Sequence, residues 1–376
     1  MAAPQTDLKP YAWSLPVTIE FGPGVAEQAA ETLLGRRVVV LAFEQAMQHA
    51  PVARIGRAVS DALLDWIEVP NGLSTLALGR SLADRVWPAL SRHPDSVLVG
   101  LGGGSVMDVA KWLRQRPMSM NTQDLEQLLT SSVPPLGWKR HALWLMPTTA
   151  GTGSEVTRWS TLWDTETKPA FKRSFDQAYA YADRAIVDPL LSVSCPQTVT
   201  LHSALDAFGH CLEVLWNRHR NPISVALAID AARHIIQALP AVLSDPINPR
   251  HRSRLSHASL QAGVAFSQTR TALAHALSYR LTLEQGVDHG AAVAVWLPLT
   301  WRMAAGCSAE VDAALQKIWD VEPSRGEHKM LDWFRKIGFG MSLQSLGIAD
   351  SAQRVQAALA QARGRNFVGR WPDGEG

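Results

Sequence analysis

The sequence predicts an α/β domain with a parallel sheet over residues 1–189, followed by an all-α domain over residues 190–376. Two observations predict this architecture. Before about residue 190, short apolar runs rich in β-branched residues alternate with stretches whose apolar residues recur at helical spacing, which is typical of a parallel sheet with helices on both faces. After Asp188-Pro189, helical patterns follow one another and the strand signal fades.

In the first part, six apolar runs are predicted strands, at residues 17–21, 37–42, 66–69, 96–101, 142–146 and 185–187. The predicted helices between them cover residues 25–34, 55–64 and 76–90. In the second part, helices are predicted over residues 203–216, 223–238, 251–268 and 273–279, with breaks at Leu239-Pro240 and in the Pro-rich stretch 245–249. The Gly- and Arg-rich end, residues 363–376, is expected to be loose.

Composition limits the class of protein. A chain of 376 residues with 47% apolar residues is globular and long enough for two domains, and a formal net charge of +2 argues against a nucleic-acid partner. Cys195, Cys211 and Cys307 show no Cys-x-x-Cys spacing, so neither a disulfide framework nor a thiolate zinc site is indicated. We find no basic-then-apolar leader and no uncharged apolar stretch of about 18 residues. We therefore expect a cytoplasmic protein that spans no membrane.

Two glycine-rich loops follow predicted strands. In Gly102-Gly103-Gly104-Ser105, the glycines let a phosphate approach the backbone closely, and the helix that follows presents free N–H groups at its N-terminus. The second loop, Pro147-Thr-Thr-Ala-Gly-Thr-Gly-Ser-Glu155, adds hydroxyls and further glycines. Two such loops on consecutive strand ends predict a dinucleotide-binding crevice at the carboxyl edge of the sheet.

One carboxylate and three imidazoles in the second part are candidate metal ligands: Asp206, His210, His275 and His289. Asp206 and His210 are four residues apart in a predicted helix, so their side chains lie one turn apart on the same face. His275 and His289 are distant in sequence, and only folding can bring them to this pair. Three nitrogen ligands and one oxygen ligand, without a thiolate, suit Fe(II) or Zn(II) better than Mg(II) or Ca(II).

These motifs, in this order, resemble the iron-containing (group III) alcohol dehydrogenase family. The motifs that carry the resemblance are Gly102-Gly-Gly-Ser-Val-Met-Asp-Val-Ala-Lys111, the loop 147–155, Ile186-Val-Asp-Pro189, Asp206-Ala-Phe-Gly-His210, His275-Ala-Leu-Ser and His289-Gly290. The resemblance implies a dehydroquinate synthase-like fold with the active site in a cleft between the two domains, and it implies that Asp206, His210, His275 and His289 hold the metal. It also implies that an NAD(P)H site is lined by Asn71, Gly103, Gly104, Ser105, Asp108, Thr148, Thr149, Thr152 and Lys172.

Within this family the chain looks most like the phosphonoacetaldehyde reductase branch, on the segments Thr161-Leu-Trp-Asp164 and Asn221-Pro-Ile-Ser. That branch reduces a two-carbon aldehyde bearing a phosphonate to 2-hydroxyethylphosphonate. Arg158 and Arg280 stand where neutral residues are expected, and together with Lys172 they are candidate ligands for an anionic substrate. Phosphonopyruvate and a neutral small aldehyde are the alternative substrates.

The resemblance implies hydride transfer from NAD(P)H to a carbonyl polarised by the metal, with Tyr279 as a candidate proton donor. NADH and NADPH both stay open, since Phe43 would tolerate a 2′-phosphate and Glu44 would repel it. A dehydroquinate-synthase-like lyase is the alternative class, and the protein is expected to act alone or as a homodimer. The segment after about residue 320 departs from the family's helical ending and looks shortened.

Overall fold

The computed structural model describes residues 10–129 and 131–371. The centre of its first part is a six-stranded parallel sheet with the strand order β1-β10-β7-β4-β2-β3. All six runs that the sequence predicts as strands lie in this sheet. In spatial order they are β1 (Thr18–Phe21), β10 (Arg184–Val187), β7 (Ala142–Pro147), β4 (Val97–Gly102), β2 (Val38–Phe43) and β3 (Leu63–Val69).

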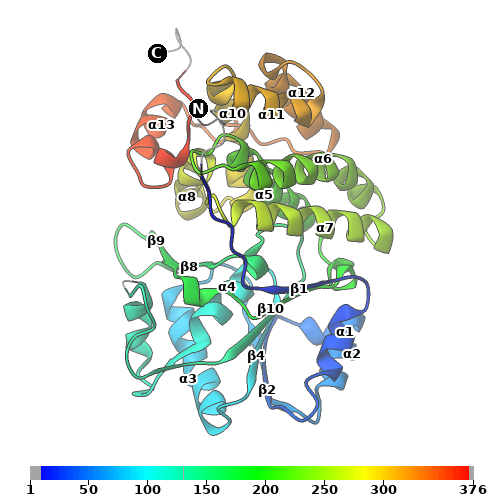
Figure 1. Cartoon of the computed structure of the whole chain (residues 1–376), viewed down its shortest axis with the longest axis vertical. Coiled ribbons are helices and arrows are strands. Elements are labelled where there is room, and N and C mark those ends of the chain that lie inside the picture. Colours follow the sequence, from blue (N-terminus) through cyan, green and yellow to red (C-terminus); the bar gives the residue numbers. More distant parts are fainter. Residues whose placement is uncertain (1–9, 130, 372–376) are drawn as a thin grey trace, which may run out of the picture.

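Helices cover both faces of this sheet (Figure 1). Successive side chains of a strand point to opposite faces, so β2 contributes to two cores. Val38 and Val40 pack on the side of α1 (Val25–Glu31) and α2 (Ala50–Ala58). Val39 and Leu41 pack on the side of α3 (Leu76–Arg92) and α4 (Gly104–Leu113). Strands that are apolar on both faces are typical of a parallel sheet between two helical layers.

The predicted helix over residues 55–64 is correct only up to Ala58. In the structure α2 ends at Ala58, and β3 begins at Leu63, which pairs with Val38 of β2. A short apolar run fits either a helix or a strand, and here pairing at the edge of the sheet decides between them.

An antiparallel hairpin, which the sequence does not predict, lies between the sheet and the helical part (Figure 1). It is formed by β8 (Trp159–Asp164) and β9 (Phe171–Asp176). Strand β8 reads Trp-Ser-Thr-Leu-Trp-Asp and is largely buried on both faces, so it lacks the alternation of apolar and polar residues that reveals a half-exposed strand. A smaller ladder joins β5 (Gln115–Pro117) to β6 (Trp138–Arg140).

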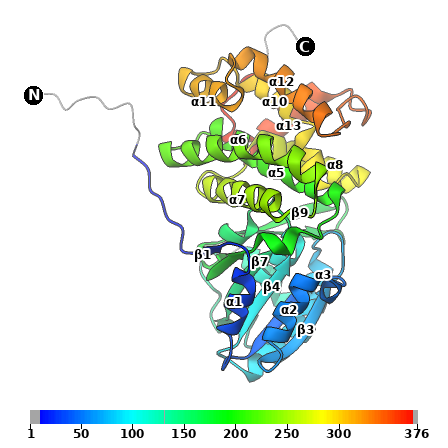
Figure 2. The same cartoon turned by 90° about the vertical axis from the view of Figure 1, so that its right-hand side faces the viewer.

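The second part is helical and lies beyond the carboxyl ends of the sheet strands (Figures 1 and 2). Its central helix, α5 (Gln197–Leu215), packs against α6, α7 and α9 in one large apolar core. The other helices are α6 (Pro222–Ser244), α7 (Pro249–Phe266), α8 (Leu273–Gln285), α9 (His289–Ala294), α10 (Leu297–Ala304), α11 (Ala309–Trp319), α12 (Pro323–Lys336) and α13 (Ser351–Leu359).

The predicted helix break at Leu239-Pro240 is wrong, because α6 continues through Pro240 to Ser244. A proline inside a helix leaves the carbonyl four residues earlier without its usual N–H donor. Here that carbonyl belongs to Ile236, and it accepts a hydrogen bond of 3.3 Å from Trp333 Nε1 of α12. A tertiary contact therefore compensates for the proline.

The end of the chain also differs from the expectation. Helices α12 and α13 occupy the segment after residue 320, so the expected departure from a helical ending is wrong. The expected loose end begins instead with a 3₁₀ turn, η6 (Gly364–Asn366), and the buried ring of Phe367 packs edge-on against Trp216. Residues 372–376 of that predicted segment lie outside the described residues.

Among the described helices, α6 is the one long and apolar enough to cross a membrane by length and composition. It packs against α5 and α7 in the helical core, and a single helix of this kind is weak evidence for a membrane protein.

The last strand of the sheet ends at Val187 and the central helix α5 begins at Gln197. The division at residue 189 falls between them. That the two parts are separate domains, able to fold independently, stays a prediction.

Candidate active site

A cavity of about 750 Å³ lies between the two parts of the chain. One wall comes from the N-terminus of α4 and the loop after β7. A second wall is the hairpin, whose alternate residues from each strand line the cavity: Trp159, Thr161, Trp163, Lys172, Ser174 and Asp176. Residues of α5, α7 and α8 close the other side. Groups far apart in sequence therefore share one space.

The two glycine-rich loops pack against each other at the carboxyl ends of the adjacent strands β4 and β7. Thr148 N donates to Gly102 O at 3.1 Å. A Cβ added to Gly104 would lie 2.7 Å from Thr152 Cγ2, so the loops approach as closely as glycine allows. Gly104 is also the first residue of α4, and its position leaves the N-terminus of that helix facing the cavity, as a phosphate site requires.

The predicted cofactor residues fall into three groups. Five of them line the cavity: Gly104, Ser105, Asp108, Thr152 and Lys172. Gly103, Thr148 and Thr149 belong to the same two loops without lining it. Asn71 follows β3 and does not line the cavity, but the next residue, Gly72, accepts from Ser105 Oγ at 3.0 Å. The backbone N and Nδ2 of Asn71 donate to Glu44 Oε2 at 3.4 and 3.0 Å.

Asp108 ties α4 to the second loop and to the hairpin. Its Oδ1 accepts from Ser154 Oγ at 2.7 Å, and its Oδ2 accepts from Thr161 N at 2.7 Å. Lys111, which is fully buried, donates to the same Ser154 Oγ at 2.8 Å and to Trp159 O at 2.6 Å. Burial lowers the pKa of Lys111 to about 8, against the attraction of Asp108. This network was not predicted. It holds α4, the second glycine-rich loop and strand β8 together at the wall of the cavity.

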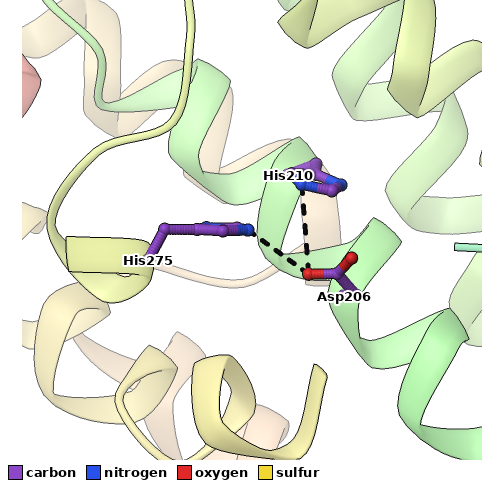
Figure 3. Close-up of side chains that lie close together, drawn as sticks. All are labelled: Asp206, His210 and His275. Atoms are coloured by element: carbon purple, nitrogen blue, oxygen red, sulfur yellow. Dashed lines mark ion pairs between the residues drawn. The ribbon is translucent and has the colours of Figure 1, made fainter. Parts of the chain in front are cut away.

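The predicted metal ligands meet around one carboxylate oxygen, and Figure 3 shows three of them, Asp206, His210 and His275. Asp206 Oδ1 lies 3.3 Å from His275 Nε2, 3.9 Å from His210 Nε2 and 3.8 Å from His289 Nε2. Ligands about 2.1 Å from one tetrahedral ion lie roughly 3.4 Å from each other, close to these separations. Asp206, His210 and His275 are buried, and the side chain of His289 is 31% exposed.

The chemistry of this cluster fits a divalent cation. Asp206 Oδ1 and His275 Nε2 are buried and lack a hydrogen-bond partner among the described residues, although buried polar atoms normally have one. Burial lowers the pKa of His210 to about 4 and that of His289 to about 3, despite the nearby Asp206 carboxylate. Burial alone would raise the pKa of Asp206, but the imidazoles hold it below its usual value. Neutral imidazoles and an ionised carboxylate are the forms that bind a metal.

Glu213 orients one ligand from behind and was not predicted. This fully buried carboxylate accepts from His275 Nδ1 at 2.8 Å, His275 N at 3.1 Å and Ala272 N at 2.6 Å. With Nδ1 bound in this way, Nε2 of His275 faces Asp206. The available signal was its place three residues after His210, on the same side of α5.

The predicted substrate residues do not all reach the cavity. Lys172 does, and its ammonium lies 4.3 Å from the ring centroid of Tyr279 and 5.7 Å from that of Trp163. Burial and then Arg363 lower the pKa of Lys172 well below its usual value. Tyr279 does not line the cavity, and burial raises the pKa of its phenol.

The prediction that Arg280 lies in the cleft is wrong. Five residues along a helix turn a side chain by roughly 140°, so Arg280 points away from the His275 face of α8. Its side chain is 62% exposed and pairs with Glu284 at 2.9 Å. Arg158 lies at the rim, outside the lining residues, and its Nε donates to Asp176 Oδ1 at 2.8 Å. Two other arginines, Arg270 and Arg363, line the cavity instead.

Two family models match the chain, one of the iron-containing alcohol dehydrogenases over residues 16–189 and one of the C-terminal part of the Fe-containing alcohol dehydrogenase family over residues 200–368. The chain belongs to the iron-containing alcohol dehydrogenase family. Members of this family are NAD(P)-dependent oxidoreductases that use a divalent metal. The family thus confirms the predicted cofactor classes, and the cluster around Asp206 is a possible metal site.

The most similar solved structures include the sulfoacetaldehyde reductase of Bifidobacterium kashiwanohense in complex with NAD⁺, with a TM-score of 0.85, 25% identity and coverage of 97% of this chain and 96% of that one. The 1,3-propanediol dehydrogenase of Klebsiella pneumoniae is 27% identical over 92% of this chain and 91% of its own. The sulfoacetaldehyde reductase of Bilophila wadsworthia is 30% identical over 54% of this chain and 51% of its own. For several curated relatives, the match spans about half of their length.

Proposed function

We propose that this protein is a metal-dependent NAD(P)H reductase of small anionic aldehydes, with phosphonoacetaldehyde as the first candidate substrate. The observation that carries the proposal is the shared cavity: the helix N-terminus suited to a dinucleotide phosphate and the Asp206 cluster suited to a metal line the same 750 Å³ space. A hydride carrier and a carbonyl-polarising ion must meet in one place for this reaction.

In this proposal the loops at Gly104 and Thr152 hold the dinucleotide phosphates, and Asp206, His210, His275 and His289 hold the metal ion. A bound divalent ion supplies Lewis-acid stabilisation of negative charge on a carbonyl oxygen, worth several kcal/mol. Phe266 stacks on the imidazole of His210 with ring centroids 3.9 Å apart, and Trp159 stacks on Phe266 at 5.2 Å. These rings line the cavity beside the ligands and exclude water from the reacting atoms.

The product alkoxide needs a proton. Lys172 lines the cavity, and burial lowers the pKa of its ammonium well below the usual value, so it is a stronger acid than a solvent-exposed lysine. Tyr279, the predicted donor, carries the ammonium of Lys172 against its ring face. We therefore propose that Tyr279 positions Lys172 and that the proton leaves from Lys172 Nζ.

Two observations support an anionic substrate. Lys172, Arg270 and Arg363 line the cavity. Two relatives are named sulfoacetaldehyde reductases, after a two-carbon aldehyde that carries a sulfonate. A sulfonate and a phosphonate present similar oxygens to a cation, so sulfoacetaldehyde is the second candidate and phosphonopyruvate the third.

Absorbance assays of NADH and NADPH consumption, with Fe(II)- or Zn(II)-loaded protein, test this function. The panel is phosphonoacetaldehyde, sulfoacetaldehyde, phosphonopyruvate, succinic semialdehyde and neutral propionaldehyde. We expect kcat/KM for at least one anionic aldehyde to exceed that for propionaldehyde at least about tenfold, the effect of one charged contact. Equal values across the panel would favour a general small-aldehyde reductase instead.

Glu44 favours NADH. Its carboxylate follows β2, next to the phosphate loops, and Asn71 holds it in place. An acidic side chain in this place can accept from a ribose 2′-hydroxyl and would repel a 2′-phosphate. We also propose a cytoplasmic location, because NAD(P)H is a cellular reductant and the three cysteines are free.

A further inference from the structure

One end of the cavity carries an excess of positive charge. Its cationic end consists of two arginines, Arg270 from the loop between α7 and α8 and Arg363 from the segment after α13, beside Lys172 of β9. Asp176 is the carboxylate in this region, and it is already shared by two arginines. Its Oδ1 binds Arg158 Nε at 2.8 Å and its Oδ2 binds Arg270 Nη2 at 2.7 Å.

Arg363 has no acidic partner in the described parts of the chain. Its Nη1 donates to Thr271 Oγ1 at 2.8 Å and its Nη2 donates to Ser174 Oγ at 3.2 Å. Its guanidinium carbon lies 5.7 Å from the ring centroid of Tyr279. These contacts are neutral, so they orient the half-buried guanidinium without neutralising its charge, and they use two of its five N–H groups.

The backbone fixes this arginine in the cavity. Arg218 N donates to Asn366 O at 2.8 Å, and Val368 N donates to Trp216 O at 3.1 Å. The segment that bears Arg363 is thus held to the end of α5, the helix that carries two predicted metal ligands. The position of the guanidinium is therefore a property of the fold and not of a free chain end.

Arg363 lies on the metal side of the cavity. One of its anchors, Thr271, is four residues before His275, and the other, Ser174, lies between Lys172 and Asp176 on β9. Neither anchor belongs to the glycine-rich loops that form the phosphate cradle. An anion bound at Arg363 would thus sit beside the metal cluster, where the substrate's second functional group must lie when its carbonyl faces the metal.

We propose that Arg363 is the residue that selects the substrate, by binding its phosphonate or sulfonate through the free N–H groups of the guanidinium. This inference rests on the proposed function and deepens it, because it names the group that separates anionic from neutral aldehydes. Arg158 and Arg280 take no part, because Arg158 donates to Asp176 and Arg280 is exposed and paired with Glu284. A planar guanidinium suits such tetrahedral oxyanions, since two of its N–H groups can bind two oxygens at once.

The test compares wild type with Arg363→Gln, Arg363→Lys and the control Arg365→Gln. Arg365 lies two residues further on, in the same turn, and is exposed. Two readouts are needed. The first is the ratio of kcat/KM for phosphonoacetaldehyde or sulfoacetaldehyde to that for propionaldehyde. The second is binding of ethylphosphonate, an unreactive probe, followed by the fluorescence of Trp159 and Trp163 in the cavity wall.

We expect Arg363→Gln to lower the selectivity ratio and the affinity for ethylphosphonate about 10- to 100-fold, the range for a hydrogen-bonded charge. Arg363→Lys should recover part of the selectivity ratio and part of the affinity, because lysine keeps the charge but lacks the paired N–H groups of the guanidinium. Arg365→Gln should change neither. An unchanged ratio and affinity in a folded Arg363→Gln protein would overturn the inference.

Two further outcomes separate the possible failures. If Arg363→Gln raises KM for NADH and leaves the selectivity ratio unchanged, the arginine binds a cofactor phosphate and the inference is overturned while the proposed function stands. If wild type shows no preference for anionic aldehydes and does not bind ethylphosphonate, the proposed substrate class and the inference both fail.

Discussion

The carboxylate of Glu213 contacts the proposed metal ligand His275 on the side away from Asp206. It accepts three hydrogen bonds, two of them from His275, and it is completely buried. A carboxylate in this place fixes the tautomer and the ring orientation of an imidazole ligand. The geometry of the cluster therefore depends on a residue that touches no metal.

Glu213→Gln should weaken metal binding about 10- to 100-fold, the usual effect of losing such an outer partner. The amide keeps the size of the side chain but cannot accept three hydrogen bonds as well as a carboxylate does. Competition with a chromophoric chelator measures the affinity. Asp164→Asn, which removes another buried carboxylate outside the cluster, is the control and should keep the wild-type value. Equal metal affinity in Glu213→Gln and wild type would contradict the role assigned to Glu213.

His275→Ala and His289→Ala should each lose bound metal and nearly all turnover, because too few ligands remain to compete with water. Metal analysis of the purified variants, with circular dichroism to establish folding, measures this. His219→Ala is the matched control, since His219 lines the cavity but lies outside the cluster. Full metal occupancy and normal activity in either ligand variant would remove that residue from the site.

At the scale of elements, the proposed phosphate site lies where α4 begins. The loop after β4 and the loop after β7 touch through Gly104 and Thr152, so a side chain at position 104 would fill the space above the helix N-terminus. A phosphate needs that space to reach the free N–H groups.

Gly104→Val should raise the dissociation constant for NADH at least about tenfold, since the branched side chain collides with Thr152 and covers the backbone donors. Fluorescence titration of NADH measures the change, and metal content should stay at the wild-type level. Gly340→Val is the control, because a Cβ there would meet nothing within 4 Å. Unchanged NADH affinity in Gly104→Val would show that this loop is not the cradle.

Glu44→Gln should increase the ratio of kcat/KM for NADPH to that for NADH about tenfold, because it removes the charge that opposes a 2′-phosphate. Initial rates with both cofactors at one aldehyde concentration measure this ratio. Glu68→Gln, at an exposed position of the neighbouring strand β3, is the control. A wild-type ratio in the Glu44 variant would place the adenosine end elsewhere.

Local sequence signals predicted the elements that obey one strong rule. The inner strands β7, β4 and β2 are apolar and largely buried, and the two glycine-rich loops directly follow β4 and β7. The hairpin β8–β9 escaped because Trp159, Thr161 and Trp163 face the cavity while Ser160 and Leu162 are buried on the other side, which leaves no periodic pattern. The helix break predicted at Pro240 is wrong because of a tertiary contact: Trp333 of α12 donates to the carbonyl of Ile236, which the proline leaves without its usual N–H donor.

At the scale of the whole molecule, the candidate active site is a cavity between the two parts of the chain, and three regions of the sequence line it. The sheet and hairpin supply the first half of the lining, helices α5, α8 and α9 supply the predicted metal ligands, and the segment after α13 supplies Arg363. Helical spacing predicted that Asp206 and His210 lie together, whereas His275 and His289 joined the predicted set through the resemblance to the family's motifs. The cationic residues of the cavity could not be predicted from the sequence. Tertiary packing decides where the side chain of Arg280 points, and it brings Arg363, near the end of the described chain, to the cavity.

Chelation and reconstitution, followed by NADH absorbance, test the central claim most directly. The account predicts that protein loaded with Fe(II) or Zn(II) consumes one NADH for each molecule of phosphonoacetaldehyde or sulfoacetaldehyde reduced. It also predicts that a chelator abolishes this consumption and that either ion restores it. If a metal-loaded protein produces no net change in NADH or NADPH with any carbonyl compound of the panel, the protein is not this reductase, and the lyase class, in which the nicotinamide is regenerated within each turnover, is favoured.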